Sequence, residues 1–175
     1  MRIAITADSH DNLVNIKKFT DFCNTNKVNL VIHCGDVTEK ATEKFFIDAL
    51  KAKIMFIGGN ADIVNQEKFK RTNRFQKIKH EPIPFLDLTI DNIKIAACHT
   101  RVKAKHLAGK NKYGLIFYGH NHKPWQEKLG RAYLVNPGNL AGLFYRASFA
   151  TYDTRRRKLE LIILDQLKQD TRSES

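Results

Sequence analysis

The chain has 175 residues, of which 42% are hydrophobic, and it carries a formal net charge of +12. This length fits one domain with a substantial core, so cross-links are not needed for folding. Its three cysteines, Cys23, Cys34 and Cys98, include no CxxC pair, which argues against a disulfide framework or a zinc knuckle. Because no apolar stretch reaches the roughly 20 residues of a membrane span and no signal-peptide core opens the sequence, we expect a cytoplasmic protein.

The first part of the sequence predicts alternating strands and helices. An apolar run at 2–7 predicts a buried strand, and apolar residues at three- and four-residue spacing over 13–23 predict a helix. Two further strands, 28–32 and 53–57, flank a second helix at 42–52. Strands that alternate with helices over short links are typical of parallel strands with right-handed crossovers.

The second part predicts mainly hairpins, whose strands pair with sequence neighbours and form a second, antiparallel or mixed sheet. A short basic helix at 102–109 and a strand at 115–118 interrupt the series. The hairpins join strands 85–90 and 93–98, 125–129 and 132–135, and 147–153 and 158–164. The expected fold class is therefore α/β, a four-layer α-β-β-α sandwich with two mixed sheets. Residues 1–168 would form a single domain, and 169–175 a frayed tail.

Residue types that bind metals follow the predicted strands at their carboxyl ends, the edge where open α/β sheets place their sites. Carboxylate, imidazole and amide groups together suit Mn²⁺, Fe²⁺, Zn²⁺, Co²⁺ or Ni²⁺ better than Mg²⁺. The sequence offers seven such groups. One ion that also binds a water needs fewer ligands, whereas two ions that share one carboxylate would use all seven. The seven candidate metal ligands are Asp8, His10, Asp36, Asn60, His99, His120 and His122.

The order of these residues resembles the calcineurin-like metallophosphoesterase superfamily over nearly the whole chain. The motifs that carry the resemblance are Asp8-x-His10, Gly35-Asp36, Gly59-Asn60-x-Asp62, His99 and Gly119-His120-x-His122. The short chain and its Asn136-Pro137-Gly138 motif resemble the small stand-alone bacterial and archaeal phosphodiesterases of that superfamily.

The resemblance implies a two-metal phosphoesterase, with a phosphodiesterase acting on small or nucleotide-like phosphate esters as the leading expectation. A hydroxide held between two divalent ions, with Mn²⁺ expected, would be the nucleophile. Asp36 would bridge the ions, and the catalytic group would be Asp36, Asn60 and His99 with that hydroxide. The first ion would be held by Asp8, His10, Asp36 and His122, and the second by Asp36, Asn60, His99 and His120.

Several positions depart from the family pattern or are open to two interpretations. Ala61 stands where many members have a histidine that contacts the phosphate or protonates the leaving group, so we expect a preference for good leaving groups. Asp62 is interpreted either as a functional group or as a helix cap. His33, Cys34 and Cys98 are expected to be buried structural residues.

Two other functions remain open. One is a protein-interaction scaffold like the retromer subunit that is similar to this fold, although all seven ligand types are present here. The other is a nucleic-acid-directed nuclease, suggested by the net charge and by basic stretches at 68–79, 101–112 and 155–158. The expected partner is a small phosphate ester, nucleic acid is an unproven second partner, no membrane is expected, and a homo-oligomer is compatible with the sequence.

Overall fold

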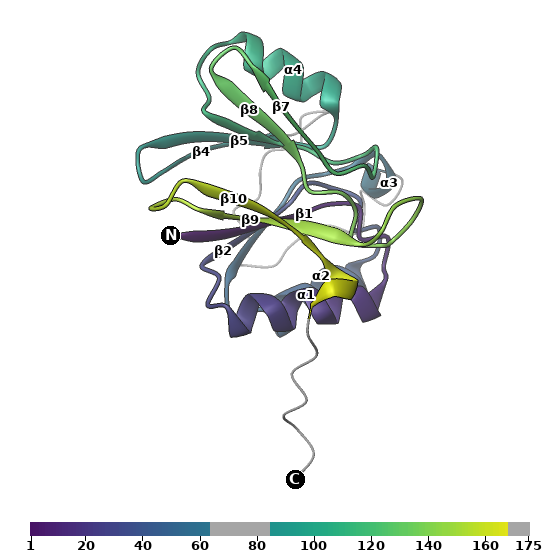
Figure 1. The fold of residues 1–175 in the computed structure, drawn as a ribbon. Coiled ribbons are helices and arrows are strands. Elements are labelled where there is room, and N and C mark those ends of the chain that lie inside the picture. The colour runs from purple at the N-terminus through teal and green to yellow at the C-terminus, as the bar shows by residue number, and fades with distance from the viewer. Residues whose placement is uncertain (64–84, 168–175) are drawn as a thin grey trace.

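The computed structural model describes residues 1–63 and 85–167, and their strands form two five-stranded sheets (Figure 1). The strands are β1 (Arg2–Thr6), β2 (Leu30–His33), β3 (Lys53–Phe56), β4 (Phe85–Ile90), β5 (Ile93–Cys98), β6 (Leu115–Phe117), β7 (Trp125–Leu129), β8 (Ala132–Asn136), β9 (Ser148–Asp153) and β10 (Lys158–Ile163). The helices are α1 (Leu13–Thr25), α2 (Lys40–Ala49), α3 (Asn60–Ile63), α4 (Arg101–Gly109) and the 3₁₀ turn η2 (Leu164–Gln166).

The layers follow one another as α1 with α2, the first sheet, the second sheet, and α4 (Figure 1). The strand order is β10-β9-β1-β2-β3 in the first sheet and β4-β5-β6-β8-β7 in the second. Both sheets contain parallel and antiparallel pairs. The prediction of an α-β-β-α sandwich with two mixed sheets is therefore confirmed. The predicted tail at 169–175 lies outside the described residues.

The parallel part of the first sheet arises from the strand–helix alternation of the sequence. β1 pairs with β2 and β2 with β3 in parallel, so all three strands end at one edge. The connecting helix α1 begins where the Asn12 side chain accepts a hydrogen bond from the Asn15 amide at 3.1 Å. It buries Ile16, Phe19 and Cys23, which recur at helical spacing, against the outer face of the sheet.

One sheet assignment is corrected by the structure. The sequence pattern places the hairpin of β9 and β10 with the second sheet, but β9 pairs antiparallel with β1, with Ile3 opposite Tyr152, and so joins the first. Residues 148–152 are all buried, so both faces of β9 are covered. This is typical of a strand inside a sheet rather than at its edge. A local pattern shows that a strand is buried, but it does not identify a partner about 150 residues away in the chain.

The second sheet is built from two hairpins around the short strand β6. The β4–β5 turn has Asp91 at φ 47° and Asn92 at φ 62°, so both residues adopt the left-handed conformation that tight hairpins need, without a glycine. β5, β6 and β8 run parallel, and β7 adds antiparallel to β8. Helix α4 covers the outer face, with Ala104 and Leu107 fully buried in its cluster.

The main core lies between the sheets, and it brings their strand ends together. Ile5 and Ile32 of the first sheet share one buried cluster with Ala97 and Phe117 of the second. At the carboxyl ends of these strands the two sheets are joined directly: His120 N donates to Asp8 Oδ2 at 2.9 Å, and His99 Nδ1 lies 2.8 Å from Cys34 O. Five strand ends therefore meet at one edge of the sandwich.

Candidate metal centre

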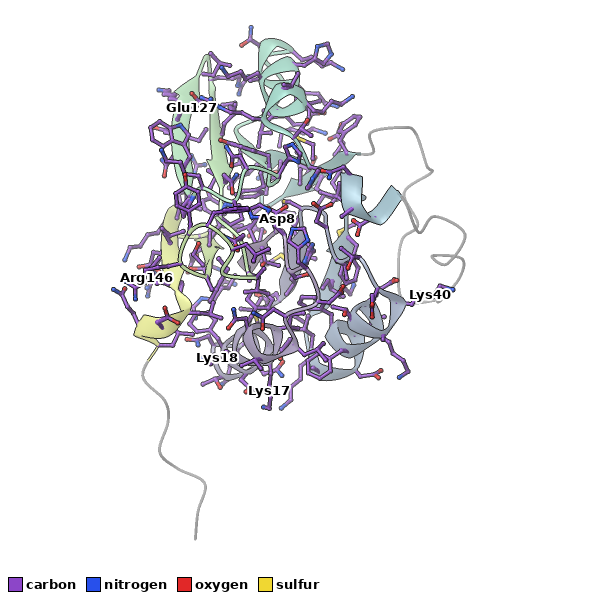
Figure 2. All side chains as sticks on the ribbon, turned by 90° about the vertical axis from the view of Figure 1, so that its right-hand side faces the viewer. Asp8, Lys17, Lys18, Lys40, Glu127 and Arg146 are labelled. Carbon is purple, nitrogen blue, oxygen red and sulfur yellow. The ribbon has the colours of Figure 1, made fainter. Side chains whose placement is uncertain are left out.

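All seven predicted ligands lie at this edge, each just beyond a strand. Figure 2 shows Asp8 between the two halves of the sandwich. β1 is followed by Asp8 and His10, β2 by Asp36, β3 by Asn60, β5 by His99, and β6 by His120 and His122. The structure thus brings together every residue that the sequence proposed for this site, while their role as ligands stays a prediction.

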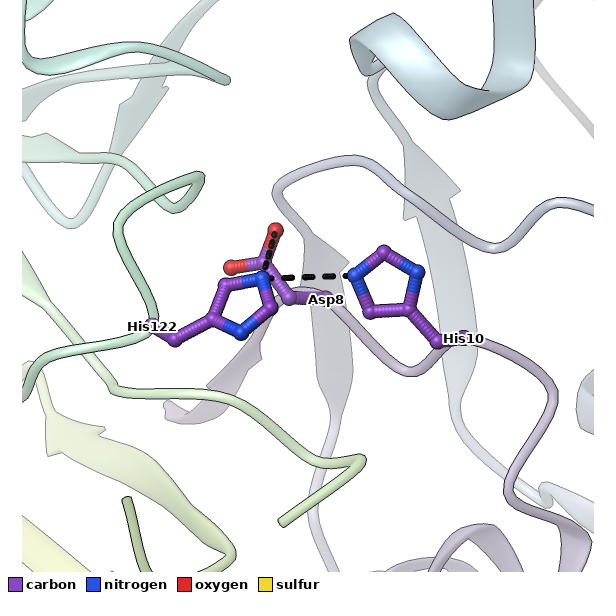
Figure 3. A group of neighbouring side chains, drawn as sticks. All are labelled: Asp8, His10 and His122. Atoms are coloured by element: carbon purple, nitrogen blue, oxygen red, sulfur yellow. Dashed lines mark hydrogen bonds and ion pairs between the residues drawn. The ribbon is translucent and has the colours of Figure 1, made fainter. Parts of the chain in front are cut away.

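A first group is formed by Asp8, His10 and His122, whose ligand atoms lie within 4.8 Å of one another (Figure 3). The Nε2 atoms of His10 and His122 are 3.3 Å apart. His122 Nε2 is 3.8 Å from Asp8 Oδ1, and His10 Nε2 is 3.9 Å from Asp36 Oδ2. Two imidazoles and a carboxylate that converge in this way offer three ligand atoms to one ion.

A second group lies on the other side of Asp36. His99 Nε2 is 3.5 Å from Asp36 Oδ2 and 2.8 Å from Asn60 Oδ1. His120 Nδ1 is 2.8 Å from the same Asn60 oxygen and 3.2 Å from His99 Nε2. Because Asp36 Oδ2 also faces His10, this one carboxylate oxygen lies between the two groups.

The hydrogen-bond pattern around His99 leaves a lone pair directed into the site. Its Nδ1 lies 2.8 Å from the Cys34 carbonyl oxygen, which can only accept, so Nδ1 carries the ring proton. Nε2 is therefore an acceptor, and it faces the Asp36 carboxylate and the Asn60 amide oxygen, which are acceptors as well. A cluster of acceptors around one point fits a cation, and the backbone bond to Nδ1 is the orienting contact typical of metal-binding histidines.

Burial shifts the titration of the groups at the centre. It raises the pKa of Asp8, which the nearby negative charge of Asp36 raises further, although the His120 amide bond lowers it. Burial also lowers the pKa of His99 and His122. Neutral imidazoles are the form that binds metal, and a divalent cation would offset the repulsion of two neighbouring buried carboxylates.

Most of the candidate ligands have left-handed backbone. Positive φ is uncommon for any residue except glycine, and it is retained where the surrounding structure enforces it. Five of the seven have it: Asp8 (51°), His10 (38°), Asp36 (62°), His120 (76°) and His122 (59°). The loops pass so close together that a Cβ on Gly59 would lie 2.1 Å from Asp36 Oδ1, and one on Gly35 would lie 2.5 Å from His99 Nδ1.

Asp62 braces the two loops that carry Asp36 and Asn60. Its carboxylate accepts from the backbone N–H groups of Asp36 (2.9 Å), Thr38 (2.8 Å) and Gly59 (2.8 Å). The bond to Gly59, just before α3, caps that short helix from within its first turn. The segment after α3, for which the sequence suggested Asp62 as a cap, lies outside the described residues, and the two other bonds reach a loop 24 to 26 residues away in sequence.

Two asparagines hold the loop that carries His120 and His122. Asn136 Nδ2 donates to Gly119 O at 3.1 Å and to Asn121 Oδ1 at 2.6 Å. Asn139 Nδ2 donates to His122 O at 3.2 Å. The motif around Asn136 is visible in the sequence, whereas Asn139 has no sequence signal that distinguishes it from an ordinary loop asparagine.

The residues expected to be structural are buried and belong to neither group of candidate ligands. His33 Nε2 lies 3.1 Å from Ser9 Oγ, and its ring packs edge-on against Phe46, so that burial lowers its pKa to about 3. Cys34 and Cys98 are free, fully buried thiols, and burial raises the pKa of Cys98 to about 12. These three predictions are confirmed.

Comparison with known proteins identifies the family. Residues 1–157 match the model of the calcineurin-like phosphoesterase superfamily domain. The chain belongs to this superfamily. A phosphodiesterase of Methanocaldococcus jannaschii is 31% identical over 170 residues, which cover 94% of this chain and 100% of the relative. The predicted enzyme class, phosphoesterase, is confirmed by this membership, and the buried His/Asp groups of this calcineurin-like phosphoesterase fit divalent metals.

Solved structures show the same architecture. An archaeal phosphodiesterase superposes on this calcineurin-like phosphoesterase with a TM-score of 0.76 at 26% identity, covering 93% of this chain and 99% of the other. Vps29 of Chaetomium thermophilum superposes with a TM-score of 0.68 at 14% identity, covering 93% and 94%, a likeness that concerns the fold alone. Within the described residues, every helix is too short or too polar to cross a membrane.

Proposed function

We propose that the protein is a two-metal phosphodiesterase that hydrolyses small or nucleotide-like phosphate esters. The observation that carries the proposal is the position of Asp36 Oδ2, 3.9 Å from His10 Nε2 in one ligand group and 3.5 Å from His99 Nε2 in the other. A shared carboxylate between two sets of nitrogen and oxygen ligands supports a pair of cations rather than one. The phosphodiesterase relative supports the diester as substrate.

In this proposal the cations, with Mn²⁺ expected, would lower the pKa of water and neutralise charge on the phosphoryl group. The chain supplies the positioning. Asp36 Oδ1 accepts from Ala61 N at 2.9 Å, which leaves Oδ2 free to face both groups. The ligands of the first ion would be Asp8, His10, Asp36 and His122, and those of the second Asp36, Asn60, His99 and His120.

The same geometry limits the leaving groups that the enzyme would accept. The residue after Asn60 is Ala61, whose methyl group holds no proton to give to a departing alkoxide. An ester whose alcohol is already acidic needs no such proton. We therefore expect aryl esters to be hydrolysed much faster than alkyl esters.

The basic surface does not favour a nuclease. Within the stretch 101–112, Arg101 forms a double hydrogen bond with Glu127, and Lys112 pairs with Asp87. The cluster 155–158 forms the β9–β10 turn, where Asp153 lies opposite Arg2 at the start of β1, whereas the candidate ligands follow the other end of β1. The stretch 68–79 lies outside the described residues.

Turnover and metal binding test the proposal together. Protein purified without chelators, then loaded with Mn²⁺, should hydrolyse bis(p-nitrophenyl) phosphate and lose this activity in excess EDTA. It should bind two ions per chain, and Mn²⁺ should raise its unfolding temperature because ligands stabilise the state they bind. Two bound ions without turnover on any mono- or diester, together with capture of a protein partner, would instead indicate the interaction scaffold.

Single substitutions should remove the ions one at a time. We expect His122→Ala to weaken chiefly the binding of the first ion and His120→Ala that of the second. Each should lower kcat by more than about tenfold, because even residues that only support a ligand cause a loss of at least that size. Isothermal titration calorimetry with Mn²⁺ should show one of two binding events lost in each variant and both in the double variant.

The matched control for these two substitutions is His106→Ala, which removes an exposed imidazole on α4 that belongs to neither ligand group. It should keep both binding events. Two calorimetric events that survive in either ligand variant would contradict the assignment of that residue.

A further inference from the structure

The loop between β8 and β9 exposes apolar side chains beside the candidate metal centre. Among the described large hydrophobic residues, Phe144 is the most exposed, at 90%, and Leu143 and Tyr145 beside it are also exposed. In Figure 1 this loop projects at the same end of the sheets as α3, which carries Asn60. An exposed phenyl ring needs an explanation here because burying it would stabilise the fold.

The base of this loop is fixed to the segment that carries Asp8 and His10. Leu140 N donates to Ala7 O at 2.9 Å, and Ala141 N donates to Asp8 O at 3.1 Å. From the other side, Asn12 Nδ2 donates to Ala141 O at 2.9 Å. The loop therefore keeps a fixed position relative to the first ligand group.

The tip of the loop is tied to His122. Asn139 joins the two segments, because its Nδ2 donates to both His122 O (3.2 Å) and Leu143 O (3.1 Å), while its Oδ1 accepts from Leu143 N at 2.8 Å. Tyr145 N donates to Leu143 O at 2.7 Å, which tightens the turn around Phe144.

Phe144 itself is held in an unfavourable conformation. Its φ of 64° is left-handed, which costs stability for a residue with a bulky side chain. Its ring centroid lies 5.7 Å from that of His122, and the two rings are tilted by 45°. A strained and exposed aromatic ring next to a candidate metal ligand is the kind of feature that proteins retain for ligand binding.

The geometry of phosphoryl transfer indicates which part of a substrate would meet this ring. In an in-line displacement the nucleophile and the leaving group lie on one axis through phosphorus. The second ester arm of a diester therefore lies to the side of that axis. Phe144 lies next to His122 of the first ligand group, so a second arm that extends past His122 would meet its ring.

We propose that Phe144 is a specificity-determining residue that stacks on a planar aromatic group, aryl or nucleobase, carried by the non-leaving arm of a phosphodiester. This inference rests on the proposed function and names the substrate class for the same site. Aromatic stacking tolerates any base because each has a flat π face. Phe144 therefore selects substrates with a planar group rather than one particular base.

The test keeps the leaving group constant and changes only the other arm. The three substrates are methyl p-nitrophenyl phosphate, phenyl p-nitrophenyl phosphate and thymidine 5′-(p-nitrophenyl phosphate), with Mn²⁺-loaded protein. We expect Phe144→Ala to lower kcat/KM about tenfold for the substrates with a planar arm, mainly through KM, and less than about twofold for the methyl substrate. Phe144→Trp should restore the preference, and Leu143→Ala should leave it intact.

A binding measurement separates this inference from the proposed function. Calorimetry should show that Phe144→Ala weakens thymidine 5′-monophosphate about tenfold and leaves methyl phosphate unchanged. If the wild-type protein shows this selective binding but hydrolyses no diester, the proposed function fails and the assignment of Phe144 stands. If only the phenyl or only the thymidine arm responds, the ligand is an aryl ester or a nucleotide, respectively.

Other results would overturn the assignment. Equal kcat/KM and equal binding in wild type and Phe144→Ala would show that the ring contacts no substrate. Sedimentation over a range of concentrations tests the alternative that the ring packs against a second copy of the chain. A dimer that dissociates in Phe144→Ala, with the same loss for all three substrates, would assign the ring to that interface instead.

Discussion

Replacing Asp36 by Asn is expected to abolish turnover and to reduce the binding of both cations. The amide keeps an oxygen for the bond from Ala61 N, so the local fold is retained, but it lacks the charge that Oδ2 directs toward His10 and His99. Mutating a residue that only supports a metal ligand lowers metal affinity or activity about 10- to 100-fold. Mutating a ligand shared by both ions should therefore lower kcat by more than about 100-fold. Elemental analysis after dialysis measures the bound ions, and bis(p-nitrophenyl) phosphate measures turnover.

The matched control is Asp21→Asn, which removes a charge of the same kind from an exposed pair with Lys17. Pairs of this kind contribute little to stability, and we expect normal turnover. An Asp36→Asn protein that binds two ions and retains turnover within a few-fold of wild type would contradict the assignment of Asp36 as the bridging ligand.

Removing the carboxylate of Asp62 is expected to have the largest effect on stability among the substitutions considered for this chain. Asp62→Ala removes the charged acceptor of three backbone N–H groups, those of Asp36 and Gly59 in a buried setting and that of Thr38 in a half-buried one. Unsatisfied buried groups cost about 1–3 kcal/mol each, and with partial relaxation we expect a loss of about 3 kcal/mol. For a chain of this length that lowers Tm by about 10 °C.

Asp62→Asn should lower the stability less than Asp62→Ala, because the amide keeps one of the two acceptor oxygens. Asp48→Ala is the control, since Asp48 forms only an exposed pair with Lys44 on α2. We also expect Asp62→Ala to weaken Mn²⁺ binding, because the loops of Asp36 and Asn60 lose their common support. Differential scanning calorimetry measures the Tm of each variant. If the Tm of Asp62→Ala lies within about 2 °C of wild type, the Asp62 carboxylate contributes little to stability.

The convergence of the candidate ligands could be predicted from sequence because each one is placed by its local strand. Each candidate ligand follows an apolar run by one to a few residues, and parallel strands place such positions at one edge. The sheet membership of β9 was not predictable in this way, because its pairing with β1 joins residues such as Ile3 and Tyr152 from opposite ends of the chain. Long-range pairing is decided by the whole core rather than by periodicity.

The contacts that support the candidate ligands could not be predicted from the sequence either. That Asp62 bonds to Thr38, or that Asn139 joins His122 to Leu143, depends on loop paths that only the assembled sandwich determines. The exposure of Phe144 is opposite to what its hydrophobicity predicts. Local rules are expected to fail in this way near functional sites, where binding rather than folding determines the residue.

The left-handed backbone at five candidate ligands has a consequence for engineering. Aspartate and histidine tolerate the left-handed conformation better than most residues, but glycine adopts it more readily still, so glycine at these positions would relieve backbone strain. Screening for heat resistance alone would therefore accept glycine at His10, His120 or His122, although each change removes a candidate ligand. Such variants would survive heating while losing their chemistry, and thermostability and catalysis would have to be selected together.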